Sequence, residues 1–371
     1  MNALGIIFSD YYTDHPVQNE LIRSRTPASL PYAGRYRTVD FALSSMVNVQ
    51  MTDIGIIAKE NYGSLIDHLG NGQDWDLNRR NGGLTMLTPL ARPETHTIAA
   101  RGRLDALRSI RGYIEDSRHD LIVMAFGGTV ANIDLGAMAA YHLENEAYLT
   151  MACSEIPAGI GEMMLARQPG GRIEKISYLL KESAENHLCA LGTYVMSRAD
   201  LLEFLAEADN QDYTNMNREL IQKNLADHRI FGYEHPGYAR VIRTVEDYFA
   251  ASMDMLKPEL QKELFLADRP VYTKVKDSVP TFYDYHAIVE NSLIADGCTI
   301  KGTVRNSVIF RGVCVEEGAV VENAILMQNS VIERDARIAC AITDKNARIS
   351  AGVEVRGSAR VPFVVGKGKR V

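Results

Sequence analysis

The chain has 371 residues, of which 46% are apolar and 23% are charged, and its formal net charge is −7. This length favours two domains, and the composition is typical of a globular protein with a sizeable core. The negative charge argues against a nucleic-acid partner. The sequence contains neither an apolar run of about 18 residues nor a charged-then-apolar leader, which predicts no membrane association and a cytoplasmic location.

Four short apolar runs in the first part of the chain are predicted to form buried strands. They are Leu4–Phe8, Ile54–Ala58, Leu121–Phe126 and Leu149–Ile156. A helix is expected over Ala100–Glu115, where Leu104, Leu107, Ile110 and Ile114 share one face. Strands that alternate with helices indicate an α/β fold with a mainly parallel, doubly wound sheet, whose ligand crevice lies at the carboxyl ends of the strands. Further helices are predicted from Ser197 onward, over Asn217–Asp227 and Glu246–Leu256, and from Pro258 to Leu266.

Between the first two strands, residues 25–48 combine a turn, a basic cluster and a helix start. Arg35 and Arg37 are planar guanidinium groups suited to holding phosphate or carboxylate. Thr38 or Asp40 can cap the helix that follows. The segment can therefore present cations to an anionic ligand, although two surface arginines without a ligand are an equally simple interpretation.

The run Pro31–Asn48 closely resembles a motif of the bacterial ADP-glucose pyrophosphorylases, and above all of their non-catalytic, GlgD-type subunits. The resemblance extends along nearly the whole chain. It implies a Rossmann-like nucleotidyltransferase domain, and it places Arg35 in the region between the two domains that binds phosphorylated activators. Arg35 and Arg37 are therefore the candidates for an effector site.

The chemistry of that family requires a glycine-rich loop for the triphosphate and carboxylates for Mg²⁺. Here the first strand is followed by Ser9–Pro16, which contains no glycine and carries the acids Asp10 and Asp14. By the same resemblance, Gly128 and Val241 stand where the family has its metal-binding aspartates. We therefore expect no catalytic residue, no metal site and no cofactor in this chain, with Mg²⁺ required only by a catalytic partner.

The glycine and neighbouring positions of the expected cleft resemble the family motifs more closely than the positions of its charged residues do. The positions that match are Gly102, Asp105, Gly127, Asp134 and Gly192. Asp134 corresponds to a later acid of the family motif, so it cannot be assumed to reach a metal. Lys175 and Lys181 are either displaced substitutes for the family's sugar-phosphate lysine or solvent-exposed lysines.

From Ile288 onward, apolar residues recur every six positions, which is typical of a left-handed parallel β-helix. We expect four coils, with glycine corners at Gly297, Gly302, Gly318, Gly352 and Gly357. The expected organisation is a nucleotidyltransferase-like domain over residues 1–250, a helical linker over 251–280 and the β-helix over 281–371. The last histidine, His286, precedes the repeats, which argues against an acyltransferase that uses a histidine on a coil.

These features lead to one main hypothesis and two alternatives. The main hypothesis is a catalytically impaired regulatory subunit that acts in glycogen biosynthesis. It would form a heterotetramer with the catalytic pyrophosphorylase subunit and respond to a phosphorylated metabolite. A homo-oligomer is possible when the chain is alone. The alternatives are a weakly active adenylyltransferase that uses Asp105, Asp134 and displaced lysines, and a stand-alone sensor of sugar phosphates.

Overall fold

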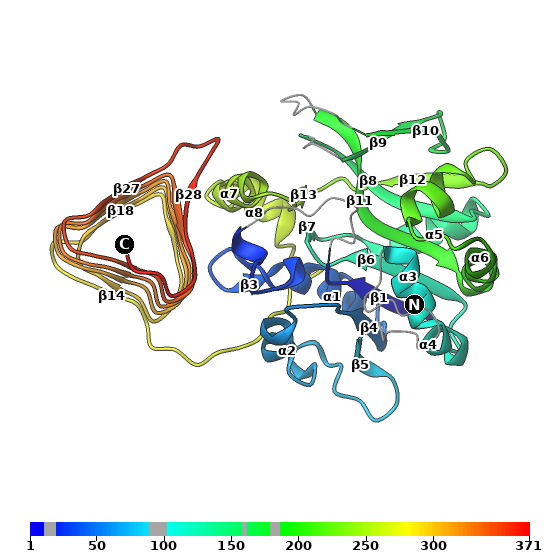
Figure 1. Ribbon diagram of the computed structural model, residues 1–371, viewed down its shortest axis with the longest axis horizontal. Helices are drawn as coiled ribbons and strands as arrows, with labels where there is room; N and C mark the ends of the chain where they lie inside the picture. The colour runs from blue at the N-terminus through cyan, green and yellow to red at the C-terminus, as the bar shows by residue number, and fades with distance from the viewer. Residues whose placement is uncertain (11–19, 89–101, 158–161, 179–185) are drawn as a thin grey trace.

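The computed structural model describes residues 1–10, 20–88, 102–157, 162–178 and 186–371, which form two parts joined by a connector (Figure 1). The first part is an α/β unit. The second is a triangular coil, seen along its axis in Figure 1. No helix of the described residues has both the length and the apolar character needed to cross a bilayer.

A nine-stranded mixed sheet forms the centre of the first part. Its strands are β1 (Ala3–Phe8), β4 (Asp53–Ile57), β5 (Gly83–Leu87), β6 (Leu121–Phe126), β8 (Leu149–Pro157), β9 (Met163–Arg167), β10 (Ile173–Tyr178), β11 (Asn186–Ser197) and β12 (Ile230–Glu234). The order is β10-β9-β11-β6-β1-β4-β5, and β8 pairs with both β11 and β12. Strands β6, β1, β4 and β5 are parallel, as predicted, whereas β11 runs antiparallel to β6 and β8. The strands β1 and β6 are buried throughout, which explains their continuous apolar sequences.

Eight α-helices are described. They are α1 (Thr38–Asn48), α2 (Gly63–Leu69), α3 (Arg103–Ser109), α4 (Arg111–Asp116), α5 (Leu135–Glu144), α6 (Arg198–Gln211), α7 (Val245–Asp254) and α8 (Pro258–Leu264). The predicted start of α6 is confirmed, because the Ser197 side chain accepts a hydrogen bond from the N–H of Asp200.

Two helix predictions were wrong in detail. The single helix expected over Ala100–Glu115 is divided into α3 and α4 at Ile110, which ends one helix and starts the next. Ile110 is β-branched and Gly112 lies close to it, and both residue types disfavour a continuous helix. The helix expected over Asn217–Asp227 is a π-helical segment, Asn217–Gln222, followed by turns.

The start of α1 also differs from the prediction. Neither Thr38 nor Asp40 is the N-cap, which is Arg37. Asp40 instead occupies the third helical position and accepts a hydrogen bond from the Arg37 N–H at 2.9 Å. This bond holds Arg37 at the beginning of the helix, next to the short hairpin of β2 (Pro31–Tyr32) and β3 (Tyr36–Arg37).

The second part is a left-handed parallel β-helix with three faces. One face contains β14 (Phe282–Tyr283), β17 (Thr299–Ile300), β20 (Cys314–Val315), β23 (Val331–Ile332) and β26 (Arg348–Ile349). The second contains β15 (Ile288–Glu290), β18 (Thr303–Arg305), β21 (Val320–Glu322), β24 (Arg337–Ala339) and β27 (Glu354–Arg356). The third contains β16 (Leu293–Ile294), β19 (Val308–Ile309), β22 (Ile325–Leu326), β25 (Ala341–Thr343) and β28 (Phe363–Val365).

Five strands on each face make five coils, so the prediction of four was wrong. The repeat predicted from Ile288 onward includes β15 and β16 of the first coil, but it misses β14, which carries the exposed aromatic residues Phe282 and Tyr283 instead of inward apolar ones. The six-residue spacing also predicts an inward side chain at Val361, which is 67% exposed, and Val365 pairs with Thr343 instead. A loop before Phe363 interrupts the six-residue spacing at that point.

The predicted glycine corners were right in part. Gly297, Gly318 and Gly352 have positive φ. Gly302 and Gly357 instead allow close backbone packing, because a Cβ atom at either position would lie 2.3 Å from a carbonyl oxygen of a neighbouring coil. Asn and Asp residues occupy other left-handed positions on successive coils, including Asn329 and Asn346.

The two parts are packed together through a buried apolar cluster and a buried ion pair. Tyr32 from the hairpin and Tyr248 from α7 belong to a cluster that also contains Phe310 and Ile342 of the β-helix. Arg25 donates to both carboxylate oxygens of Asp344 at 2.6 and 2.7 Å. Residues 266–281 then cross between the parts without helix or strand.

Candidate functional site

The first candidate is the cleft at the carboxyl end of β6, where a glycine pair follows the strand. The N–H of Gly127 donates to the carbonyl of Phe8 at 2.9 Å, which ties this turn to the end of β1. A Cβ atom on Gly128 would lie 2.5 Å from the ring of Phe126. Gly192, with φ of +73°, packs against the other side of Phe126. The Phe126 ring therefore occupies the space that a side chain at position 128 would need.

The side chain of Arg103 also packs against Phe126 at the end of β6. The Arg103 guanidinium lies 5.5 Å from the ring centre of Phe8 and 5.4 Å from that of Phe126. Gly102, just before it, allows the chain to pass close to the Thr214 carbonyl, since a Cβ there would lie 2.2 Å from that oxygen. Gly102, Gly127 and Gly192 thus lie around one aromatic and cationic cluster.

The other aligned acid position is equally changed. Val241 is buried in β13 (Ala239–Val241), which pairs with β7 (Thr129–Ala131). Arg243, two residues later, is ion-paired with the buried Glu162 at 3.7 Å. An aliphatic side chain and a cation offer no ligand to a divalent metal.

Asp105 and Asp134, the two acids that the resemblance places at the cleft, are engaged in structural contacts. Asp134 caps α5 by accepting from the Ala137 N–H, and it pairs with Arg269 at 3.0 Å. Asp105 pairs with Arg108 at 3.1 Å, and Arg108 also binds Asp209 of α6. Both acids are therefore already neutralised by arginine.

The described residues do not fit the Mg²⁺ chemistry of the family. Among them, no three His, Cys, Asp or Glu side chains come together as a metal site. The segment containing Asp14, and also Lys181, lies outside the described residues. Lys175 is an exposed residue of β10.

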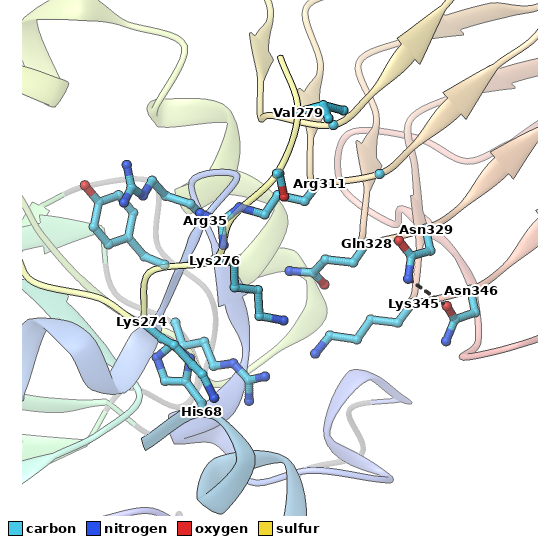
Figure 2. Close-up of a pocket in the computed structure, with 15 residues that line it drawn as sticks. Arg35, His68, Lys274, Lys276, Val279, Arg311, Gln328, Asn329, Lys345 and Asn346 are labelled. Atoms are coloured by element: carbon cyan, nitrogen blue, oxygen red, sulfur yellow. Dashed lines mark hydrogen bonds between the residues drawn. The ribbon is translucent and has the colours of Figure 1, made fainter. Parts of the chain in front are cut away.

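The second candidate is an open cavity of about 480 Å³ between the hairpin, the connector and the β-helix. Its cationic side chains are Arg35, Arg37, Lys274, Lys276, Arg311 and Lys345, to which His68 is added. None of the described lining residues is Asp or Glu. Figure 2 shows the ends of Lys276, Gln328 and Lys345 pointing into the same space. A volume of this size with convergent cations is suited to a small polyanion.

Arg35 and Arg37 both line this cavity, where the hairpin faces the β-helix, but Figure 2 shows the Arg35 side chain pointing away from Lys276 and Lys345. Arg35 is exposed, and its guanidinium lies 5.6 Å from the ring centre of Tyr36. Arg37 is half buried and donates to the Ser64 hydroxyl at 2.8 Å. Arg311 enters from the opposite wall, where it pairs with Asp296 at 2.8 Å.

The crowding of like charges perturbs the cavity lysines. Burial, followed by the charges of Arg37 and Arg25, lowers the pKa of Lys345 to about 7. Burial and the charges of Arg37 and Arg311 also lower the pKa of Lys276. Burial lowers the pKa of Arg37 to about 10, although Asp40 acts in the opposite direction. A bound anion would reverse these shifts, because it favours the charged form of each group.

Below the arginines, a buried pair holds the cavity floor. Nε2 of His68 lies 2.6 Å from Oδ1 of Asp40, and the edge of the His68 ring faces Trp75. Burial lowers the pKa of His68, with Asp40 opposing the shift. Because Asp40 also receives the Arg37 N–H, this pair links the cavity to the start of α1.

Sequence reasoning identified two of the cavity residues and missed the rest. Lys274 and Lys276 lie in the segment over 251–280 that is predicted only as a linker. Lys345 lies within the predicted β-helix, where the sequence gives no role to any lysine. Two lysines close together in the connector were the available signal there, whereas the charge of Lys345 is balanced in the sequence by the adjacent Asp344. Only the packing of the two parts places these residues together.

The chain matches known proteins over nearly its full length. Residues 20–255 match the family described as nucleotidyl transferase, and residues 279–359 match the family described as GlmU-like, C-terminal hexapeptide. Over 368 residues the chain is 32% identical to the glycogen biosynthesis protein GlgD of Bacillus subtilis (strain 168), which covers 98% of this chain and 96% of that protein.

Two further relatives support the same relationship. The chain is 38% identical over 321 residues to the glycogen biosynthesis protein GlgD of Geobacillus stearothermophilus, covering 86% of this chain and 82% of that protein. It is 29% identical over 350 residues to the glucose-1-phosphate adenylyltransferase of Bacillus thuringiensis (strain Al Hakam), covering 93% of each.

Proposed function

The chain belongs to the nucleotidyltransferase family that includes the GlgD glycogen biosynthesis proteins, and from this premise we propose that it is a non-catalytic, regulatory subunit of ADP-glucose pyrophosphorylase. Its relatives named GlgD and glucose-1-phosphate adenylyltransferase support a role in glycogen biosynthesis. Within that role, the chemistry of the two candidate sites supports assigning regulation, and not catalysis, to this chain.

The loss of catalysis is supported by the cleft around Phe126. Transfer of an adenylyl group brings anionic groups together, and its charge must be neutralised at the reacting atoms. The positions that would hold a metal carry Gly128 and Val241, and the space beside Gly128 is filled by an aromatic ring. Asp134 is held by Arg269, so it is not placed to replace the missing acids.

The observation that carries the regulatory proposal is the cationic cavity between the two parts. Arg35 and Arg37 come from the nucleotidyltransferase-like part, whereas Arg311 and Lys345 come from the β-helix. A phosphorylated metabolite bound there contacts both parts at once. The bound metabolite therefore stabilises the conformations in which the cations of the two parts lie close together, and it increases the population of those conformations.

The effect on glycogen synthesis requires a second subunit. The first coil of the β-helix exposes Phe282, Tyr283 and Tyr285, the last of which is 94% exposed. Its strands β14, β15 and β16 each stand at the end of a sheet, with one unpaired edge. Such a surface favours association, and we propose the catalytic pyrophosphorylase subunit as the partner, in a heterotetramer. Reciprocal coupling between effector binding and the partner's affinity for substrate is then expected.

The test measures ADP-glucose formation from ATP and glucose 1-phosphate by this chain alone, by the catalytic paralogue alone and by their mixture. We expect no turnover by this chain alone and a changed rate or effector response in the mixture, with a panel of sugar phosphates as probes. Arg37→Gln should abolish the added response, whereas Arg360→Gln, at an exposed position outside the cavity, should preserve it.

The same experiment separates the alternatives. Substantial turnover by the isolated chain would favour a weakly active adenylyltransferase. Binding of sugar phosphates with no effect on the paralogue would favour a stand-alone sensor. Either result would contradict the proposed regulatory subunit.

A further inference from the structure

Lys345 occupies an unusual position for a lysine. It is half buried at the wall of the cationic cavity, directly after the buried Asp344. Both oxygens of Asp344 are bound by Arg25, and one of them also accepts the backbone N–H of Lys345 at 2.6 Å. The Lys345 side chain forms no hydrogen bond or ion pair with the residues that the structure describes. The nearest acid is thus occupied by another cation.

This environment makes the Lys345 amine a potential nucleophile. Burial and two neighbouring arginines lower its pKa to about 7, so that a large fraction of the side chain is the neutral amine near neutral pH. Only the neutral form has a free electron pair, and an ordinary exposed lysine is almost fully protonated under these conditions.

The surroundings of this amine can hold a phosphate group. Lys276 and Gln328 point toward the same space as Lys345 (Figure 2). Arg37 and Arg311 line the same cavity and supply guanidinium groups, which bind phosphate with two parallel hydrogen bonds. A ligand whose phosphate is held by these cations would bring an attached carbonyl group close to the amine.

We propose that Lys345 is an acylation site that reacts with acyl phosphates bound in the cationic cavity. The proposal uses the cavity of the proposed function but requires neither a partner subunit nor an effector response. In the reaction, the electron pair of Lys345 Nζ attacks the acyl carbon, and a C–N bond forms. The bond from the acyl carbon to the phosphate oxygen breaks, inorganic phosphate leaves, and the amine proton is released to solvent. No oxidant or metal is consumed.

The consequence for the cavity is a change in charge. An acylated Lys345 is neutral and cannot become protonated, so the cavity loses one cation and part of its volume. We therefore expect the modified chain to bind polyanions more weakly than the unmodified chain.

The experiment incubates the full chain with acetyl phosphate at pH 7 and follows the acetylation of each lysine by peptide mass spectrometry. Lys262 and Lys367, which are exposed, are the reference positions. We expect Lys345 to react at least about ten-fold faster, because its greater deprotonation is only partly offset by the lower nucleophilicity of a weaker base. Inorganic sulfate should protect Lys345 and leave Lys262 unaffected.

Two comparisons separate phosphate recognition from simple amine reactivity. A neutral acetyl ester should still favour Lys345 in the Lys276→Gln variant, whereas acetyl phosphate should lose most of its preference there. Arg311→Gln provides a second variant if the first is poorly folded, as judged by thermal unfolding. Equal rates at Lys345 and Lys262, or no protection by sulfate, would overturn the proposal. Because the assay uses the chain alone, its outcome is independent of whether the catalytic paralogue is regulated.

Discussion

At the scale of single residues, the ionisation of Lys345 is expected to couple the proposed anion binding to pH. Its pKa is about 7 in the free protein. A bound dianion raises that pKa, so binding takes up a proton at pH values between the free and the bound pKa. The affinity therefore increases as the pH falls toward 7 and becomes constant, for this group, at lower pH.

We predict that the affinity for inorganic sulfate increases by up to about ten-fold per pH unit between pH 9 and pH 7, as expected for the uptake of one proton. Sulfate is the appropriate probe because its own charge is constant in this range. Isothermal titration calorimetry measures both the affinity and the proton uptake. In Lys345→Arg the slope should decrease by about one proton, and an unchanged slope would show that another group titrates.

The buried pair of Arg25 and Asp344 leads to a second residue-scale prediction. Their side chains are only 2% and 4% exposed. Asp344→Asn leaves the Arg25 charge buried without a partner, and we expect a loss of about 3–5 kcal/mol in the free energy of unfolding, measured with urea.

The matched control is a pair on the surface of the β-helix. Arg334 and Glu317 are 68% and 71% exposed, so Glu317→Gln should cost less than about 1 kcal/mol. A similar small cost for Asp344→Asn would mean that water reaches the buried pair.

At the scale of secondary-structure elements, the turn after β6 determines whether catalysis can be restored by simple substitution. Gly128 is followed by β7, whose partner β13 contains Val241. The two positions are therefore close in the fold, as the aspartates of a metal site must be. However, the Phe126 ring fills the side-chain space at position 128.

We predict that the double variant Gly128→Asp, Val241→Asp forms no ADP-glucose above background when assayed alone with Mg²⁺. The aspartate at 128 has to displace Phe126, which should cost about 1–3 kcal/mol of stability. The single variant Val241→Asp controls for the burial of one carboxylate. Substantial recovery of activity would show that the aromatic ring and the replaced loop were overrated as obstacles.

The start of α1 is the element that connects the cleft side of the sheet with the cavity. Arg37 caps the helix and reaches the cavity, while Asp40 in the first turn binds the Arg37 N–H and His68. A shift of this turn would move the Arg37 guanidinium and the floor of the cavity together. The element is therefore suited to respond to a ligand, because several cavity groups depend on one backbone segment.

At the scale of the whole molecule, the exposed first coil of the β-helix is the surface expected to join a partner. Phe282 is 56% exposed and Tyr285 is 94% exposed. In Figure 1 the strand β14, which contains Phe282, lies at the outer side of the triangular coil, away from the α/β part.

We predict that the double variant Phe282→Asp, Tyr285→Asp weakens association with the catalytic paralogue by at least about ten-fold, because charges replace aromatic groups that a partner would desolvate. Light scattering after size-exclusion chromatography measures the loss of the mixed oligomer. Leu143→Asp, at a 61% exposed position of α5, is the control for an added charge elsewhere. Unchanged association in the double variant would place the interface on another face.

The sequence by itself determined the features that depend on neighbouring residues. The apolar strands β1 and β6 and the β-helix repeat were predictable, because strand burial and a six-residue coil impose a period along the chain. The family resemblance likewise predicts that Gly128 and Val241 replace metal-binding acids, and this stays a prediction.

Only the tertiary structure decided how these segments combine into sites. Arg25 and Asp344 are 319 positions apart, and the cavity joins Arg37 to Lys276 and Lys345 from three separate segments. No local period specifies such contacts, because they arise from the packing of the two parts through a shared apolar cluster. The lowered pKa of Lys345 has the same origin, since it results from burial and from charges that are distant along the chain.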